Sequence, residues 1–293
     1  MIFVNKNNLA GKISVLTFPS MLIVIFILTS IRVFPQSNLQ KQFEYALKLY
    51  NEEKYFDAIN EFKRLQFFDS LNLYSFLSSK LIGMSYKQGG KFNEAIKYFS
   101  LAEFSTANLD SLFEMKIEVV TTNLLRRTTY RAFDLLNELK EDARFADKKD
   151  QIIYWHGWAY IFNDEWEKAS EEFAKLDINH ELKQLSDNVS ESQYSVNKAK
   201  ILSYILPGSG QFYTGNYFSG ILSLGWVGLW TYISVQALLA DRIFDGLMIS
   251  DFLAFRFYNG NLQNAEKFAV EHNSEVSNWM LSYLQRNFRG PKP

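Results

Sequence analysis

The sequence predicts an all-α protein, with a solenoid of about four helical hairpins followed by a helical hairpin in a membrane. Three observations lead to this fold class. Only 5 Pro and 14 Gly occur in 293 residues, which favours long helices over a turn-rich β fold. A pattern of small, aromatic and Ala residues recurs every 37 residues within residues 38–178. No charged residue lies between Lys200 and Asp241, a stretch long enough to hold a membrane-spanning helix.

Residues 1–37 predict a secretory signal peptide. Lys6 and Lys12 precede the apolar run 21–28, and the polar residues 35–37 follow it, which is the order of regions in such signals. The run is shorter than the roughly 20 apolar residues needed to cross a bilayer. The alternative is an uncleaved N-terminal anchor.

Residues 38–178 contain the recurring pattern. In each copy a small residue is followed three positions later by an aromatic or apolar residue, and nine positions after that by Ala. The clear copies have their alanines at Ala58, Ala95 and Ala169, and the double spacing before Ala169 predicts a hidden copy at Ala132. In that copy Val120 replaces the small residue.

The pattern resembles the tetratricopeptide repeat (TPR). TPR helices place a small residue and Tyr on the first helix, as Gly83 and Tyr86 do here, and Ala and Phe on the second, as Ala95 and Phe99 do. The resemblance implies a groove, lined by the first helices, that binds a protein partner. The matching groove residues are Phe43, Leu47, Tyr50, Leu77, Lys80, Met84, Lys87, Tyr154 and Trp158. Alternatively, the chain just before the repeats, a neighbouring helix or a second copy in a homo-oligomer covers this face.

The remaining segments are predicted as a capping helix and linker over residues 179–200, a membrane hairpin region over residues 201–262, and a C-terminal tail over residues 263–293. The apolar run 218–240 is the expected spanning helix, with a buried helix of a soluble domain as the alternative. Residues 243–258 form either the return half of the hairpin or a helix in the membrane interface. Arg242 and Asp245 can pair on one helix face.

A distinctive motif opens the hairpin region. Its residues are Ser203, Leu206, Pro207, Gly208, Gly210, Gln211, Tyr213 and Gly215, with a second block at Tyr258, Gly260 and Asn261. The motif is similar to the P-G-x-G-Q-x-Y-x-G family of small membrane domains, which implies a membrane hairpin and no particular activity. Polar side chains in an apolar stretch need hydrogen-bond partners. We therefore expect Gln211, Tyr213, Asn259 and Asn261 to meet at one membrane–water interface.

The composition argues against several classes of function. Lys+Arg (31) and Asp+Glu (32) balance, which argues against a nucleic-acid binder. With no Cys and three widely spaced His, we expect no catalytic site, metal or cofactor. We expect a non-enzymatic, exported, membrane-anchored adaptor or scaffold at a bacterial cell envelope, with its repeats in the periplasm and its anchor in the inner membrane. The alternative is an accessory factor for membrane-protein assembly or transport, in which the hairpin carries the function.

Overall fold

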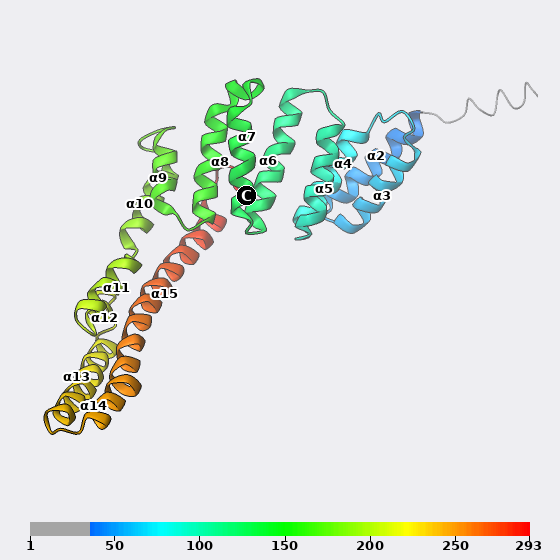
Figure 1. Cartoon of the computed structure of the whole chain (residues 1–293). Helices are drawn as coiled ribbons and strands as arrows, with labels where there is room; N and C mark the ends of the chain where they lie inside the picture. Colours follow the sequence, from blue (N-terminus) through cyan, green and yellow to red (C-terminus); the bar gives the residue numbers. More distant parts are fainter. Residues whose placement is uncertain (1–35) are drawn as a thin grey trace, which may run out of the picture. The chain divides into compact units, whose positions relative to one another are not determined.

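The computed structural model describes residues 36–293, and over this range the chain is helical with no strand. The predicted signal peptide lies outside the described residues, apart from its last two positions, which begin the first described helix. The chain forms two compact units, one ending at Arg126 and the other beginning at Arg127 (Figure 1). This division falls inside the predicted repeat region, residues 38–178.

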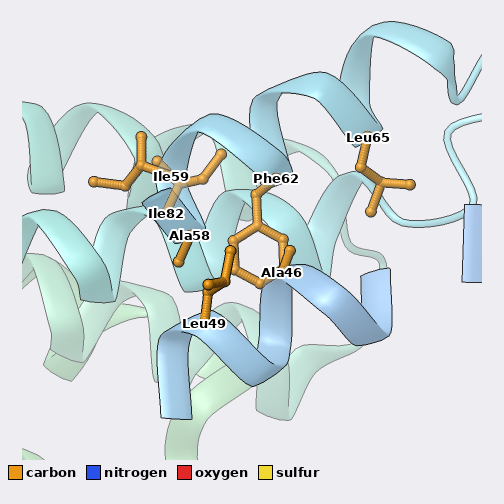
Figure 2. Close-up of a cluster of buried hydrophobic side chains, with 7 residues drawn as sticks. All are labelled: Ala46, Leu49, Ala58, Ile59, Phe62, Leu65 and Ile82. Atoms are coloured by element: carbon orange, nitrogen blue, oxygen red, sulfur yellow. The ribbon is translucent and has the colours of Figure 1, made fainter. Parts of the chain in front are cut away.

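The first unit consists of helices that pack in consecutive pairs, each against the next along the chain. They are α2 (Gln36–Asn51), α3 (Tyr55–Phe68), α4 (Ser75–Gln88), α5 (Phe92–Phe104) and α6 (Leu109–Leu125). Figure 2 shows one core cluster, in which the ring of Phe62 from α3 lies against Ala46 of α2. Ala46, Ala58 and Phe62 lie at positions of the recurring pattern, and all three are fully buried. Close packing at such positions limits the size of the side chain.

The second unit begins with helices of the predicted repeat region and continues into the predicted hairpin region. Its elements are α7 (Thr129–Glu141), η1 (Ala143–Lys148), α8 (Lys149–Phe162), α9 (Trp166–Ala174), α10 (Glu181–Ser192), α11 (Val196–Ile205), α12 (Ser209–Tyr213), α13 (Tyr217–Leu239), α14 (Ile243–Ile249), the π-helical η2 (Ser250–Ala254) and α15 (Phe255–Asn287). The segment predicted as a tail from residue 263 is helical up to Asn287, because it is part of the 33-residue helix α15.

The 37-residue period is present in the backbone. The turns before α3, α5, α7 and α9 each contain one residue with positive φ, and these residues are spaced by 37: Glu53, Gly90, Arg127 and Asp164, with φ of 60°, 69°, 62° and 60°. A left-handed residue reverses the chain direction tightly between two helices. The alanines of all four copies, including the hidden copy at Ala132, are fully buried.

The small residue of the pattern makes room for an aromatic ring. A Cβ added to Gly83 would lie 2.7 Å from the ring of Phe99, and one added to Gly157 would lie 2.5 Å from the ring of Phe173. Glycine therefore permits the close approach of α4 to α5 and of α8 to α9. Val120 occupies this position in the third copy, and the division between the two units falls within that copy, after Arg126.

Helices α14 and η2 and the start of α15 return along α13. Residues 243–258 therefore pack against the apolar helix, which agrees with the hairpin alternative of the sequence analysis. The predicted pair of Arg242 and Asp245 is confirmed, with 3.8 Å between Nη1 and Oδ2. Farther along, α15 contacts α12, α11 and α10, so this helix runs beside the chain segment that leads into the hairpin (Figure 1).

Candidate functional site

In the first unit, the predicted groove residues of α2 and α4 lie close to one another. The ring of Phe43 stacks on Tyr74 at 5.2 Å and lies 5.9 Å from Phe62. The hydroxyl of Tyr50 is 4.0 Å from the sulfur of Met84. Leu47 is half-buried against the core, whereas Leu77 remains exposed. The surface is therefore a shallow apolar face with most of its side chains partly covered.

The two predicted groove lysines are paired with α6. Lys80 Nζ lies 2.6 Å from Glu114 Oε1, and Lys87 Nζ lies 3.0 Å from Glu118 Oε2. Lys87 also donates to the hydroxyl of Thr121 at 2.9 Å. Because each lysine already has an acidic partner, this face offers little free positive charge to an acidic ligand.

In the second unit, the predicted groove residues on α8 are covered by the chain itself. Trp158 is 2% exposed, and its ring lies 5.9 Å from that of Phe288, which follows α15. The hydroxyl of Tyr154 donates to the backbone carbonyl of Pro291. Burial raises the pKa of Tyr154 to about 12, so this hydroxyl stays protonated and remains a donor. This face is therefore covered at Tyr154 and Trp158, but by the segment that follows α15, which was not among the expected covers.

A hollow of about 710 Å³ lies on another side of the first unit, where the sequence predicted no site. Leu39 and Tyr45 of α2 and the end of α3 line it, together with the loop before α4. Phe67 on this surface is 82% exposed. The sequence signal was four apolar residues, Phe67, Phe68, Leu71 and Leu73, among polar ones in a segment that ends a helix and forms a loop.

The Pro-Gly motif interrupts the helical path after α11, and Asn261 of α15 repairs the interruption. Pro207 has no N–H, so it cannot donate to the carbonyl of Ser203 four residues earlier, as a helical residue would. Asn261 Nδ2 donates to this carbonyl at 3.0 Å instead, and Asn261 Oδ1 accepts the N–H of Gly208 at 2.7 Å. One side-chain amide thus satisfies both backbone groups.

Gln211 completes this arrangement. Its Nε2 lies 3.1 Å from Asn261 Oδ1, 3.0 Å from the Asn261 carbonyl and 3.2 Å from Ser223 Oγ. Its Oε1 accepts from Ser203 Oγ at 2.9 Å, and that hydroxyl accepts the N–H of Gly210 at 3.0 Å. We call Ser203, Gly208, Gly210, Gln211 and Asn261 the break network. All five residues are buried, and their polar groups satisfy one another without solvent.

Two glycines of the break network allow close backbone approach. Gly208 has φ of 91°, and a Cβ there would lie 2.3 Å from the carbonyl oxygen of Gly220 in α13. A Cβ on Gly210 would lie 2.2 Å from the carbonyl oxygen of Ala199 and 2.8 Å from Cβ of Ala265. The motif glycines therefore bring α11, α12, α13 and α15 together at one point.

Of the four polar side chains that were predicted to meet, only Gln211 and Asn261 contact each other. Tyr213 and Asn259 lie elsewhere. The hydroxyl of Tyr213 accepts the N–H of Ser195 at 3.2 Å, and Asn259 is exposed. Tyr213 lies two residues after Gln211, and Asn259 lies two residues before Asn261. Two residues correspond to a rotation of about 200° around a helix, so Tyr213 and Asn259 point away from the network.

The other motif residues have lesser or local roles. Tyr258 donates to the carbonyl of Tyr204 at 2.7 Å, which ties the start of α15 to the end of α11. Gly215 has φ of 76° in the turn before α13, where a side chain would be strained. A Cβ on Gly260 would meet nothing within 4 Å, so no contact explains this glycine.

Polar contacts that the sequence did not predict join α15 to α9 and to the loop between α10 and α11. Asn273 exchanges two hydrogen bonds of 2.8 Å with the backbone of Tyr194. Ser277 accepts from the indole N–H of Trp166 at 2.9 Å. No spacing rule points to these pairs, since the partners are 79 and 111 residues apart.

The hairpin exposes a broad apolar surface. Helix α13 is 23 residues long, and its most apolar window has a mean hydropathy of 1.4 with only 17% of its residues buried. By length and composition it is the one helix among the described residues that could cross a membrane. Exposed apolar side chains continue on the neighbouring segments at Ile201, Tyr204, Ile205, Phe244, Leu247, Phe252 and Phe255.

Charged residues mark both ends of this apolar surface. At one end Lys200 Nζ lies 3.0 Å from Glu266 Oε2, and Lys198 lies over the ring of Tyr213 at 4.9 Å. At the other end Arg242 pairs with Asp245. The apolar surface is therefore a band with charged groups near both ends, and it also contains two exposed charged residues, Asp251 of η2 and Arg256 of α15.

Comparisons with protein-family models, curated proteins and solved structures find no match to this chain. Over residues 36–293 no group of three or more His, Asp or Glu side chains is placed to hold a metal ion. The candidate functional surfaces are therefore the apolar band of the hairpin, the face of α2 and α4, and the covered face of α8.

Proposed function

We propose that this chain is a non-enzymatic, exported adaptor or scaffold anchored in a membrane of a bacterial cell envelope. In this proposal the helical pairs before α10 form a TPR-like solenoid that binds a protein partner on the periplasmic side. The hairpin of α13 to α15 holds the solenoid at the inner membrane. One observation carries the proposal: the longest apolar helix of the described chain exposes most of its surface instead of burying it.

The exposure of α13 favours a membrane over a soluble core. An apolar helix at the centre of a soluble protein buries its side chains against others. In α13, by contrast, Ile221, Leu229 and Tyr232 are 61%, 45% and 63% exposed. Exposed apolar area on this scale needs an apolar environment or a partner.

The break network supports the same proposal. Within hydrocarbon every backbone polar group has to find a partner inside the protein, because water is absent. Asn261 meets this requirement at Pro207, where the helix would otherwise leave the Ser203 carbonyl and the Gly208 N–H unpaired. An irregular segment whose Ser203 carbonyl and Gly208 N–H are paired within the protein is suited to lie within a bilayer.

The backbone period supports the adaptor part of the proposal. Four tight turns at intervals of 37 residues, each followed by a helix with a buried Ala, are what stacked helical hairpins require. In the first unit the face of α2 and α4 retains an exposed Leu77 beside the half-buried Phe43 and Leu47. This face is our candidate for the partner surface.

Membrane anchoring is tested by a pair of matched substitutions. Leu229 lies near the middle of α13 and is 45% exposed, while Leu101 of α5 is 42% exposed. A lysine at the centre of a membrane helix costs about 2.5–3.5 kcal/mol in insertion, whereas a lysine on a water-exposed helix costs little. We expect the parent chain and Leu101→Lys to stay in the membrane pellet after a carbonate wash, and Leu229→Lys to lose membrane association. Release of the parent chain into the supernatant would refute the anchor.

Partner binding is tested by crosslinking from one position on the candidate face and one away from it. A photoreactive residue at Leu77 should capture a discrete protein in native membranes, while the same residue at Leu101 should not. Capture of the same proteins from both positions would contradict a specific partner surface. If Leu77 captures nothing and positions on α14 capture membrane proteins, the accessory-factor alternative is favoured.

A further inference from the structure

The segment that follows α15 lies on α8 as a peptide ligand would lie on a receptor. Helix α15 ends at Asn287, and Phe288 leaves it with extended backbone angles of φ −67° and ψ 128°. From there the chain reaches α8, where the ring of Phe288 packs on Trp158 and the Pro291 carbonyl accepts from Tyr154. Phe288 is 8% exposed, so this aromatic side chain is almost completely buried.

The segment has a definite chemistry, Phe-x-Gly-Pro. A Cβ on Gly290 would lie 2.5 Å from the ring of Phe288, so glycine is required if the ring is to stay on Trp158. Pro291 fixes its own φ and has no N–H, which favours an extended backbone whose carbonyl is free to accept a hydrogen bond. Arg289, between Phe288 and Gly290, is exposed.

The attachment is small enough to be reversible. The described contacts between the segment and α8 are one hydrogen bond, to Tyr154, and one ring pair, with Trp158. Lys292 turns back to the carbonyls of Phe288, at 3.2 Å, and of Gln285 in α15, at 2.5 Å, so its described hydrogen bonds do not involve α8. Helix α15 is held separately by Asn273 and Ser277, so the segment can detach without loss of the helix.

We propose that this face of α8 is a peptide-binding surface and that residues 288–293 are its resident, displaceable ligand. The partner it fits is an extended protein segment with the same chemistry, namely an aromatic residue followed by a glycine and a proline two and three positions later. This inference specifies the partner class of the proposed adaptor and rests on that function. It also assigns the segment a role in keeping the surface closed until a competing segment is present.

The test compares the full chain with a chain that stops after Asn287, both in detergent, using a fluorescent peptide of residues 286–293 as the probe. The truncated chain should bind the peptide saturably. The full chain should bind it at least tenfold more weakly, because the tethered segment competes at an effective concentration in the millimolar range. Anisotropy measures both, and circular dichroism checks that truncation leaves the helices intact.

Variants of the peptide and of the truncated chain test whether the peptide binds at Tyr154 and Trp158. Peptides with Phe288→Ala or Gly290→Ala should lose at least tenfold in affinity, while the matched Arg289→Ala peptide should bind as the parent does. In the truncated chain Trp158→Ala should abolish binding, and Tyr154→Phe should weaken it several-fold.

Three results would overturn the proposal: a truncated chain that is folded but does not bind the peptide, a truncated chain that unfolds, or equal binding of all three peptide variants. The first would leave α8 without a peptide-binding surface, and the second would make the segment a fixed part of the fold. To separate folding from binding, the full chain with Phe288→Ala offers a second test, since it should keep its helices by circular dichroism and gain peptide affinity. If the peptide does not bind, the proposed membrane anchor is unaffected, because the carbonate wash tests membrane anchoring separately.

Discussion

Replacing Asn261 with Leu removes the side chain that repairs the break at Pro207. Leu is similar in size but can neither donate nor accept a hydrogen bond. Gln211 keeps its bonds to the residue 261 carbonyl and to Ser223, so two buried groups lose their partner, the Ser203 carbonyl and the Gly208 N–H. Each buried polar group left unpaired costs roughly 1–3 kcal/mol, so we expect a loss of about 2–6 kcal/mol.

The matched control is Asn259→Leu, which makes the same chemical change two residues earlier on the same helix. Asn259 is exposed, and its side chain has no described hydrogen bond. Exposed substitutions of this kind change stability by about 0.5 kcal/mol or less. The difference between the two variants therefore isolates the break network from general effects of a more apolar α15.

Thermal unfolding in detergent, followed by circular dichroism and by resistance to protease, measures the difference. For a unit of this size a loss of about 2–6 kcal/mol lowers the melting temperature by roughly 4–24 °C. Asn259→Leu should melt with the parent chain. If Asn261→Leu also melts with the parent, the two backbone groups have found other partners and the role given to Asn261 is refuted.

Three further outcomes are expected. Gly210→Ala should destabilise the chain by about 1–3 kcal/mol through overcrowding, whereas Gly225→Ala, with nothing within 4 Å, should not, and equal melting of the two would contradict the close packing. Gly157→Ala should lower the melting temperature, and Phe173→Leu should restore part of the loss by making space, an effect that a double-mutant cycle measures. Burial lowers the pKa of His156, so the unfolded chain takes up a proton first, and stability should fall as pH drops below about 6.5. His156→Phe should show a smaller loss between pH 7.5 and 5.5, and an unchanged pH profile would refute this.

The repeat region was readable from the sequence because its determinants are local. The spacing from Gly157 to Phe173 reflects two helices joined by one tight turn, so a fixed interval in sequence becomes a fixed contact in space. The same logic located the hidden copy at Ala132, whose surroundings are degenerate but whose position is fully buried.

The break network was only partly predictable. Composition identified Gln211 and Asn261 as polar side chains in need of partners, but it could not separate them from Tyr213 and Asn259. That choice depends on the rotation of α12 and α15, which is set by packing. The pairing of Asn261 with Gly208, 53 residues earlier, and the position of Phe288 on Trp158 depend on how α15 is placed, and no local pattern encodes this placement.

The long separation between Pro207 and Asn261 also imposes an order on biogenesis. A ribosome makes the break at Pro207 and the whole of α13 before it reaches residue 261, so the newly made segment has to wait for its partner amide. During this interval the carbonyl of Ser203 and the N–H of Gly208 lack this partner. The hairpin is therefore completed late, from its C-terminal side.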